Sequence, residues 1–530
     1  MLKNNYFKVN LFLFSIIIIS LLVIPFKVLA EDNRVIVGIS EEPNTLDVHQ
    51  SGANISGRVA YYLGDSLITQ DLDTLDFHPG LAKDWEISED GQTWTFYLKE
   101  GIKFHNGDEL TAEDFKFTFE RALDYGGVTS GKLSSLEEVE VIDDYTFSLH
   151  LDKPDATLLQ SLSHAGWLHP MNKDVVEEHG EDYGQNPLSV GSYKFKSWDS
   201  GESIILEKNE EYDWAAPFYE NQGSPEIDEI EFKVIPEAST QMAALETGEI
   251  DIVLLEDKDV QRFQEDSDFY ILENMRLGLG MFVIFNLEKE PFDSVPVRKA
   301  INYAINKDSI VQIVKNGNAE KAYGPLPPSF WGYDEDVEEY GYNYDPDKAA
   351  SILEDEGWVD SDNDGIREKD GEKMSFTLEI QSVDDWQRTA QIIQDQLKQI
   401  GIEIKIQQYE WGTLLDSLSN GNHDMSLMGY TYDGPDVLYL FLHSSQIDDG
   451  INWSFIQDDE IDSLIEEGRT TVEPDDRETI YKDLQKYIVD EAVWAPVYVD
   501  IRYTAVNNRV ENVQNHPLQW LIYQDARIID

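Results

Sequence analysis

The segment from 281 to 314 constrains the fold most, because it joins a strand pattern directly to a helix pattern. Residues 281–286 are apolar and rich in aromatic and β-branched side chains, which predicts a buried strand. Pro296 suits the first turn of a following helix, which Asp293 or Ser294 can cap. Beyond it, apolar side chains share one helical face: Val297, Ala300, Ile301, Ala304 and Ile305. The segment therefore predicts a strand that leads into a core helix.

Two β-α-β patterns flank this segment and predict parallel strands joined by packed helices. The first has strands at 227–235 and 249–255 around a helix at 239–245. The second has strands at 376–380 and 402–406 around a helix that ends at Gly401. Further strands are predicted at 34–40, 93–98 and 425–430, with a hairpin at 139–151 and a helix at 112–123. The chain is thus of the α/β class, and its 530 residues exceed what one core holds.

The first 30 residues are typical of a secretory signal peptide. Lys3 and Lys8 precede an apolar run at 11–24, and small residues at 28–30 suit cleavage. The run is short for a membrane span, although an uncleaved anchor is the alternative. We expect a soluble protein that is periplasmic or extracellular.

Cysteine usage and charge exclude several partners. The chain has no cysteine, which excludes disulfides and a lipid anchor attached to a cysteine. Its formal net charge of −64 repels nucleic acid and anionic lipid. The acidic residues are spread along the whole chain, and we interpret them as a halophile-like adaptation to high salt. We expect a monomer.

Three blocks of sequence carry a family resemblance. The block at 80–123 begins GLAKDW and includes an Asn106-Gly107 turn, and Thr111 and Asp114 suit a helix start after it. A second block begins at Phe285-Asn286, and a third reads YDPDKAA at 344–350. Together they resemble the family 5 extracellular solute-binding proteins of peptide and nickel ABC importers. Val48, Val190 and Ser192 depart from the family pattern.

The resemblance implies a two-lobed periplasmic-binding-protein fold of the hinge-closing type II. Mixed sheets form both lobes, and the first lobe carries an extra subdomain. On this reading the signal peptide covers 1–30, and the first lobe combines 31–70, 188–278 and 498–530. The inserted subdomain covers 71–187 and the second lobe covers 279–497.

The resemblance also implies a function in transport. The protein would capture dipeptides or oligopeptides in a cleft between the lobes and deliver them to ABC permease subunits in the membrane, without a cofactor. An oligosaccharide-binding or nickel-chelate-binding importer subunit is the alternative within the family. HExxH, GxSxG, phosphate-loop and SxxK motifs are absent from the sequence, so we expect no enzyme, with a secreted glycosidase as the rival of another class.

Two charged residues are candidate contacts for the ends of a peptide. Asp433 resembles the aspartate that holds the α-ammonium group of the ligand in peptide-binding relatives, and a carboxylate is the right partner for it. Arg388, in the first turn of a predicted helix, resembles the arginine that binds the ligand carboxylate. The alternatives are a turn-capping role for Asp433 and a surface ion pair between Arg388 and Asp384 or Asp385.

Polar and aromatic residues near the predicted cleft loops complete the candidate site. Because ligands of α/β sheets gather beyond the carboxyl ends of strands, we include Asn44 in the loop after the first strand. Tyr430 stands where relatives often have tryptophan. The other candidates are aromatic: Trp386 and Trp411, with Trp331 and Trp453 close by in the sequence. Such side chains are more often core than contact, but they also suit sugar rings.

The sequence offers one weak metal motif. Asp360, Asp362 and Asp364 alternate as at the start of a calcium loop. The twelfth position, which needs an acid, is Gly371, and Asp370 falls one residue short. A solvated acidic loop without metal is therefore the preferred interpretation. His164 and His169 lack helix-face spacing, which gives nickel ligation little support.

Overall fold

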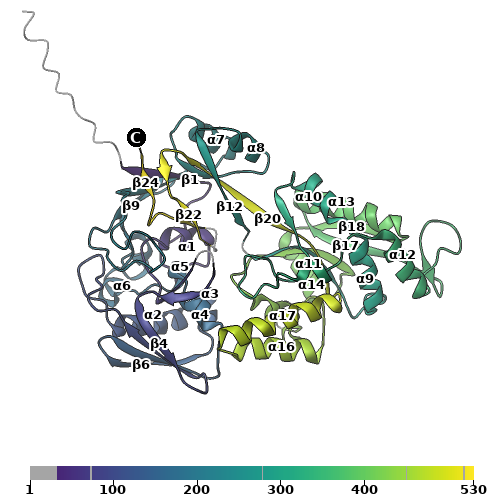
Figure 1. Ribbon diagram of the computed structural model, residues 1–530, viewed down its shortest axis with the longest axis horizontal. Coiled ribbons are helices and arrows are strands. Elements are labelled where there is room, and N and C mark those ends of the chain that lie inside the picture. The colour runs from purple at the N-terminus through teal and green to yellow at the C-terminus, as the bar shows by residue number, and fades with distance from the viewer. Residues whose placement is uncertain (1–32, 72–73, 277, 449, 517–519, 530) are drawn as a thin grey trace, which may run out of the picture.

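The computed structural model describes residues 33–529 apart from 72–73, 277, 449 and 517–519. The predicted signal peptide lies outside these residues. Two mixed sheets share one long strand, β20 (Trp494–Asn507). Figure 1 shows this strand running between two bodies, with the early elements and the C-terminal tail in one of them.

The first sheet is built from seven strands around β1. Its order is β8 (Tyr193–Asp199), β9 (Ser203–Lys208), β10 (Glu229–Val234), β1 (Arg34–Ile39), β11 (Ile252–Leu254), β20 and β12 (Phe269–Met275), the last pairing only with β20. The first predicted β-α-β unit is present as β10, α7 (Ala238–Glu246) and β11. Its strands are parallel, but β1 lies between them and pairs with both.

The second sheet uses the other half of β20. Its order is β18 (Glu403–Tyr409), β17 (Ser375–Gln381), β19 (Met425–Tyr430), β13 (Leu279–Phe285) and β20, with β14 (Ala319–Lys321) also pairing with β20. The second predicted β-α-β unit, β17, α13 (Asp384–Gln399) and β18, has directly paired parallel strands. We call the elements around the two sheets the first and the second lobe.

The chain passes between the lobes from β12 to β13 and along β20. Residues 494–498 of β20 pair with β13, whereas residues 501–507 pair with β12. Gly280 is needed at this crossing, because a Cβ atom there would lie 2.1 Å from the carbonyl oxygen of Tyr498. Two strands in close contact therefore form the junction between the lobes.

A four-stranded antiparallel sheet forms a subdomain of the first lobe. Its order is β4 (Ala82–Ile87), β5 (Thr93–Leu98), β7 (Thr146–Leu151) and β6 (Leu136–Asp143). Helix α2 (Ala112–Tyr125) packs on it, and the backbone N–H of Thr111 donates to Asp114 Oδ2 at 2.9 Å, as the predicted helix start requires. The predicted hairpin at 139–151 is present and begins three residues earlier.

The remaining helices are distributed over both lobes. In the first lobe these are α1 (Asn54–Ala60), α3 (Gly127–Gly131), α4 (Leu158–Leu162), α5 (Ala165–Leu168), α6 (Lys173–His179), η1 (Gly180–Gln185) and α8 (Val260–Gln264). In the second they are α9 (Val295–Ala304), α10 (Lys307–Val314), α11 (Val337–Tyr340), α12 (Pro346–Asp355), α14 (Trp411–Ser419), α15 (Val437–Leu442), η2 (Ser444–Gln446), α16 (Asp459–Thr470) and α17 (Pro474–Asp490). No helix among the described residues is long and apolar enough to cross a membrane.

Short strand pairs complete the fold, two of them within the C-terminal tail, and side-chain contacts fasten that tail to the first lobe. They are β2 (Ile68–Gln70) with β3 (Phe77–Pro79), β15 (Glu368–Lys369) with β16 (Glu372–Lys373), β21 (Val510–Glu511) with β24 (Arg527–Ile528), and β22 (Gln514–Asn515) with β23 (Leu521–Ile522). Arg509 Nε lies 2.5 Å from Oδ1 of the buried Asp251, and the hydroxyl of Tyr62 donates to the carbonyl oxygen of Leu521 at 2.7 Å. The tail thus belongs to the core of the first lobe.

The segment at 281–314 folds as the sequence predicts. β13 leads to α9, and the five side chains of the predicted apolar face are at most 1% exposed. Ser294 is the N-cap residue and Pro296 lies in the first turn. The domain boundaries proposed from the sequence stay a prediction.

Candidate ligand-binding site

A cavity of about 320 Å³ lies between the subdomain of the first lobe and the second lobe. The lobes meet beside it, where the backbone N–H of Ala156 donates to the carbonyl oxygen of Arg469 at 2.8 Å. The first lobe contributes Phe77, Gly131, Lys132, Ser134, Thr157, Gln160 and Ser161; the second contributes Trp331, the loop 432–436, Tyr439, Leu440, Arg469 and Arg477.

Asp433 is the most telling residue of this cavity. It follows β19, at the carboxyl end of a strand of the second sheet, which is where the strand rule places ligand contacts. Its side chain is 17% exposed, and its Oδ2 accepts a hydrogen bond from Lys132 Nζ in the first lobe. Burial alone would raise the pKa of Asp433, but Lys132, together with His164, outweighs this and holds the pKa below its ordinary value. The Asp433 carboxylate is therefore charged, and the ammonium group of Lys132 is bound to it.

His164 supports the same carboxylate from the first lobe. Its Nε2 lies 3.4 Å from Asp433 Oδ2 and 3.2 Å from Nε2 of Gln160, and its side chain is 2% exposed. Burial, with Lys132 nearby, lowers the pKa of His164 to about 4. The imidazole is thus neutral at pH 7, and Lys132 supplies the charge that balances Asp433.

Two arginines of the second lobe also line the cavity. Arg469 Nε lies 2.7 Å from Asp436 Oδ1, and its guanidinium lies 3.7 Å from the ring centre of Tyr439. Arg477 lies 4.7 Å from the ring centre of Trp331. Burial raises the pKa of Asp436 to about 6, although Arg469 opposes the shift. The cavity thus combines aromatic faces with three cations and two carboxylates.

A second hollow, of about 590 Å³, also has walls from both lobes. Leu272 and Asn274 of β12 line it from the first lobe, and Pro328 and Ser329 line it from the second. The loop at 328–331 borders both hollows, because Trp331 faces the smaller one. The space between the lobes therefore extends beyond the contacts of Asp433.

Arg388 is not among the residues that line the cavity of Asp433. Its Nη1 donates to the carbonyl oxygen of Val314 at 3.2 Å, and its Nη2 donates to that of Ile313, so it binds the last turn of α10. Its Nη1 lies 3.9 Å from Asp384, which is the surface pair that the sequence offered as the alternative. The structure does not bring Arg388 and Asp433 together, and its carboxylate-binding role stays a prediction.

The other candidate residues have mostly local partners. Trp386 and Trp411 pack edge to face at 6.3 Å, and Trp453 is buried against Phe441. Tyr430 packs edge to face on Phe441 at 5.0 Å. The exposed Asn44 accepts hydrogen bonds from the hydroxyls of Ser51 and Ser56. Of the candidate tryptophans, Trp331 is the one that lines the cavity of Asp433.

Sequence reasoning missed the first-lobe residues around Asp433. Lys132 and Gln160 stand in stretches without a recognisable motif, and His164 was considered only as a nickel ligand. The pairing of Lys132 with Asp433 joins positions 301 residues apart, which no local pattern reveals.

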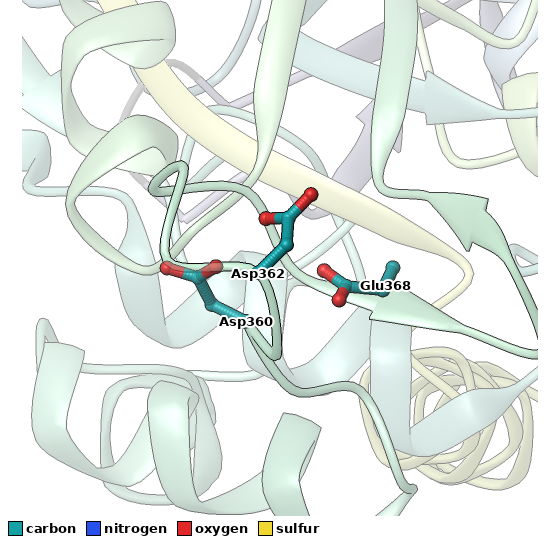
Figure 2. Close-up of side chains that lie close together, drawn as sticks. All are labelled: Asp360, Asp362 and Glu368. Atoms are coloured by element: carbon teal, nitrogen blue, oxygen red, sulfur yellow. The ribbon is translucent and has the colours of Figure 1, made fainter.

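The acidic loop at 360–368 gathers three carboxylates (Figure 2). Asp360, Asp362 and Glu368 have ligand oxygens within 4.8 Å of one another, so Glu368 joins the motif instead of a twelfth residue. However, the ammonium of Lys373 pairs with Asp362 at 3.1 Å and also with Asp364. The loop neutralises part of its own charge, and its carboxylates are mostly exposed; the solvated loop without metal stays a prediction.

Comparison with known proteins places the chain in a family. The model of the bacterial extracellular solute-binding proteins, family 5 (middle region), matches residues 76–449. The chain belongs to this family. Family 5 proteins are solute-binding proteins and not enzymes, and they are extracellular.

Relatives of this family 5 protein differ in what their names say they bind. The dipeptide-binding protein of Escherichia coli is 30% identical over 81% of this chain and 82% of its own length. Heme-binding protein A of Haemophilus influenzae is 28% identical over 83% of this chain and 82% of its own length.

A solved structure confirms the fold. The oligopeptide-binding protein AppA of Bacillus subtilis, in complex with a nonapeptide, matches with a TM-score of 0.70 and 28% identity. The match covers 94% of this chain and 99% of AppA. The family 5 chain therefore has the mixed α/β periplasmic-binding-protein fold that the resemblance implied.

Proposed function

We propose that this protein is the substrate-binding component of an ABC importer and captures peptides between its lobes. The observation that carries the proposal is the charged Asp433 carboxylate in a cavity with walls from both lobes. A buried carboxylate is the partner that the α-ammonium group of a peptide needs. The names of the dipeptide- and oligopeptide-binding relatives support the same class of ligand.

Capture requires that the lobes move relative to each other. The strands that join the lobes are the natural hinge, and the cavity of Asp433 lies at the contact between the subdomain and the second lobe. A ligand that touches both walls favours the closed form, which the membrane permease then recognises. The mature protein would act outside the cytoplasmic membrane.

The larger hollow suits the remainder of a peptide. With the amino end at Asp433, the chain of the ligand can continue past Trp331 toward Pro328 and Asn274. Backbone hydrogen bonds and water-filled side-chain pockets would then give affinity with little sequence preference.

Arg388 would serve the carboxyl end only if it exchanged its present partners. Its guanidinium would have to leave the carbonyl oxygens of Ile313 and Val314. Equal losses for short and long peptides in Arg388→Ala would therefore point to stabilisation of α10 and not to a carboxylate clamp.

Heme is the second candidate ligand, because one relative is named a heme-binding protein. Sugars and nickel chelates gain less support. Among the described residues, the cluster with metal-ligand geometry is the exposed one at 360–368, which contains no histidine.

Native mass spectrometry of the purified protein tests the proposal by detecting co-purified ligand. A mixed envelope of small peptide masses is the expected result. A single heme mass or a ladder of hexose masses would replace peptides as the ligand class.

Asp433→Ala should weaken the binding of a free-amine peptide by about 2–5 kcal/mol, the range for removal of one partner of a buried charged pair. Isothermal titration calorimetry measures the change. Asp228→Ala is the matched control, since the Asp228 side chain is 53% exposed and lines neither hollow, and it should leave affinity unchanged. Unchanged affinity in Asp433→Ala would remove Asp433 from the site.

A further inference from the structure

The carboxylate assigned to the amine of the ligand already holds an ammonium group of the protein. Lys132 directly follows α3, and its Nζ donates to Asp433 Oδ2 across the interface between the lobes. A lysine ammonium and a peptide α-ammonium are the same chemical group, with three N–H donors and one positive charge. Each can therefore take the place of the other at this carboxylate.

Charge argues against both ammonium groups binding at once. Lys132, Arg469 and Arg477 already line the cavity with Asp433 and Asp436 as the carboxylates. A ligand ammonium beside Lys132 would have to share the carboxylate of Asp433, because Asp436 is already paired with Arg469. An uncompensated charge at a partly buried position is costly, so one of the two ammonium groups must leave.

Lys132 has the means to leave. Its side chain is 16% exposed and borders the cavity, into which a flexible four-carbon stem can turn. His164 and Gln160 are fixed in α4 and the turn after it, so they remain beside Asp433 when Lys132 moves.

We propose that Lys132 is a built-in occupant of the amine subsite, which a free-amine ligand must displace from Asp433. This inference rests on the proposed function. Lys132 thereby sets specificity: only ligands that offer an ammonium and enough further contacts can compete with it. If Lys132 occupies Asp433 in about nine of ten ligand-free molecules, it lowers the apparent affinity about tenfold.

The experiment compares tri-alanine with N-acetyl-tri-alanine as calorimetric probes of the full-length mature protein. Wild type, Lys132→Met and Lys132→Gln are titrated in the same buffer, after circular dichroism has verified that each is folded. Lys153→Met, which removes an exposed lysine of the same lobe, is the control for net charge. We expect both Lys132 variants to bind tri-alanine at least tenfold more tightly than wild type. Their affinity for the acetylated peptide and the behaviour of Lys153→Met should match wild type.

Three results would overturn the inference about Lys132, and they differ in whether the proposed function also fails. If wild type binds tri-alanine and the Lys132 variants bind it no better, Lys132 is not a competitor, while peptide capture stands. If the affinity of the Lys132 variants rises equally for tri-alanine and for N-acetyl-tri-alanine, the increase does not depend on the amine of the ligand. If none of the proteins binds tri-alanine, even with Lys132 removed, Asp433 is not an amine site and the proposed function fails as well.

Discussion

Two lysines join the lobes of this protein, and their surroundings differ. Lys132 pairs with one carboxylate, Asp433, at the edge of a cavity. Lys315, at the end of α10, lies 2.8 Å from Asp257, 2.9 Å from Asp385 and 3.1 Å from Asp500. Asp257 belongs to the first lobe and Asp500 to the shared strand β20, so this second cluster sits at the junction.

The number of carboxylates and the exposure of each lysine distinguish a permanent ion pair from one that can open. Burial would lower the pKa of Lys315, but Asp500, Asp257 and Asp385 raise it well above its ordinary value. No ligand could replace an ammonium that three carboxylates hold in a side chain only 9% exposed. Lys132 has one carboxylate and free space beside it. We interpret the Lys315 cluster as structural and the Lys132 pair as exchangeable.

The largest expected effect comes from removing the ammonium at the junction. Lys315→Met removes the ammonium from Asp257 and Asp385, while Asp500 keeps its pair with Arg276 at 3.3 Å. We expect a loss of about 3–5 kcal/mol in the free energy of unfolding, the range for breaking a buried charged pair. Urea denaturation measures it.

Lys321→Met is the matched control for this prediction. Lys321 pairs with Asp308 at 3.0 Å on the surface, and such pairs contribute at most about 1 kcal/mol. Similar losses in the two variants would mean that burial of Lys315 does not matter, which would break the comparison.

A pH effect should distinguish the cavity from the junction, because only the cavity pair has a buried histidine beside it. His164 faces Lys132, Asp433 and Gln160, and it interacts electrostatically with His516. Its folded pKa of about 4 lies below the ordinary 6.5, so its contribution to stability is complete above pH 6.5 and is lost as pH falls toward 4.

The difference in unfolding free energy between wild type and His164→Gln should therefore shrink by about 3 kcal/mol between pH 7 and pH 4. Urea denaturation at several pH values measures it. The other buried histidines titrate in both proteins, so their contributions to the pH dependence cancel in the difference between the two unfolding free energies. A difference that does not change with pH would show that His164 is not held neutral.

The smallest effect is expected for Lys132→Met without ligand. Water in the cavity and His164 can still solvate Asp433, so the loss in unfolding free energy should be about 1–2 kcal/mol. Urea denaturation beside Lys315→Met sharpens the comparison directly. A loss as large as that of Lys315→Met would mean that Lys132 is part of the permanent interface.

Local patterns predicted elements well where burial and periodicity agree. The strand β19 has the bounds predicted from the sequence, and the buried face of α9 was predicted residue by residue. Sequence patterns predicted the order of strands in the sheet less well, because a strand from a distant part of the chain can lie between two that are neighbours in sequence. The two strands of the first β-α-β unit are parallel, but β1 from the start of the chain lies between them.

Site residues show the same limit. Asp433 was predicted from a motif, and the structure places it in a cavity at the end of a strand. Arg388 was predicted to bind a ligand carboxylate because it is positively charged and lies in the first turn of a helix. Packing of α13 beside α10 supplied carbonyl oxygens that compete for the same guanidinium.

The α/β class, the family and the motif that contains Asp433 follow from the sequence alone, because these depend on local periodicity and on residues close together in the chain. Which charges meet depends on the packing of distant segments. Lys132 reaches Asp433, and Lys315 reaches Asp257, because β20 and the β12–β13 crossing bring the two lobes together. Pairing across an interface depends on three-dimensional distance and burial, which no stretch of sequence contains.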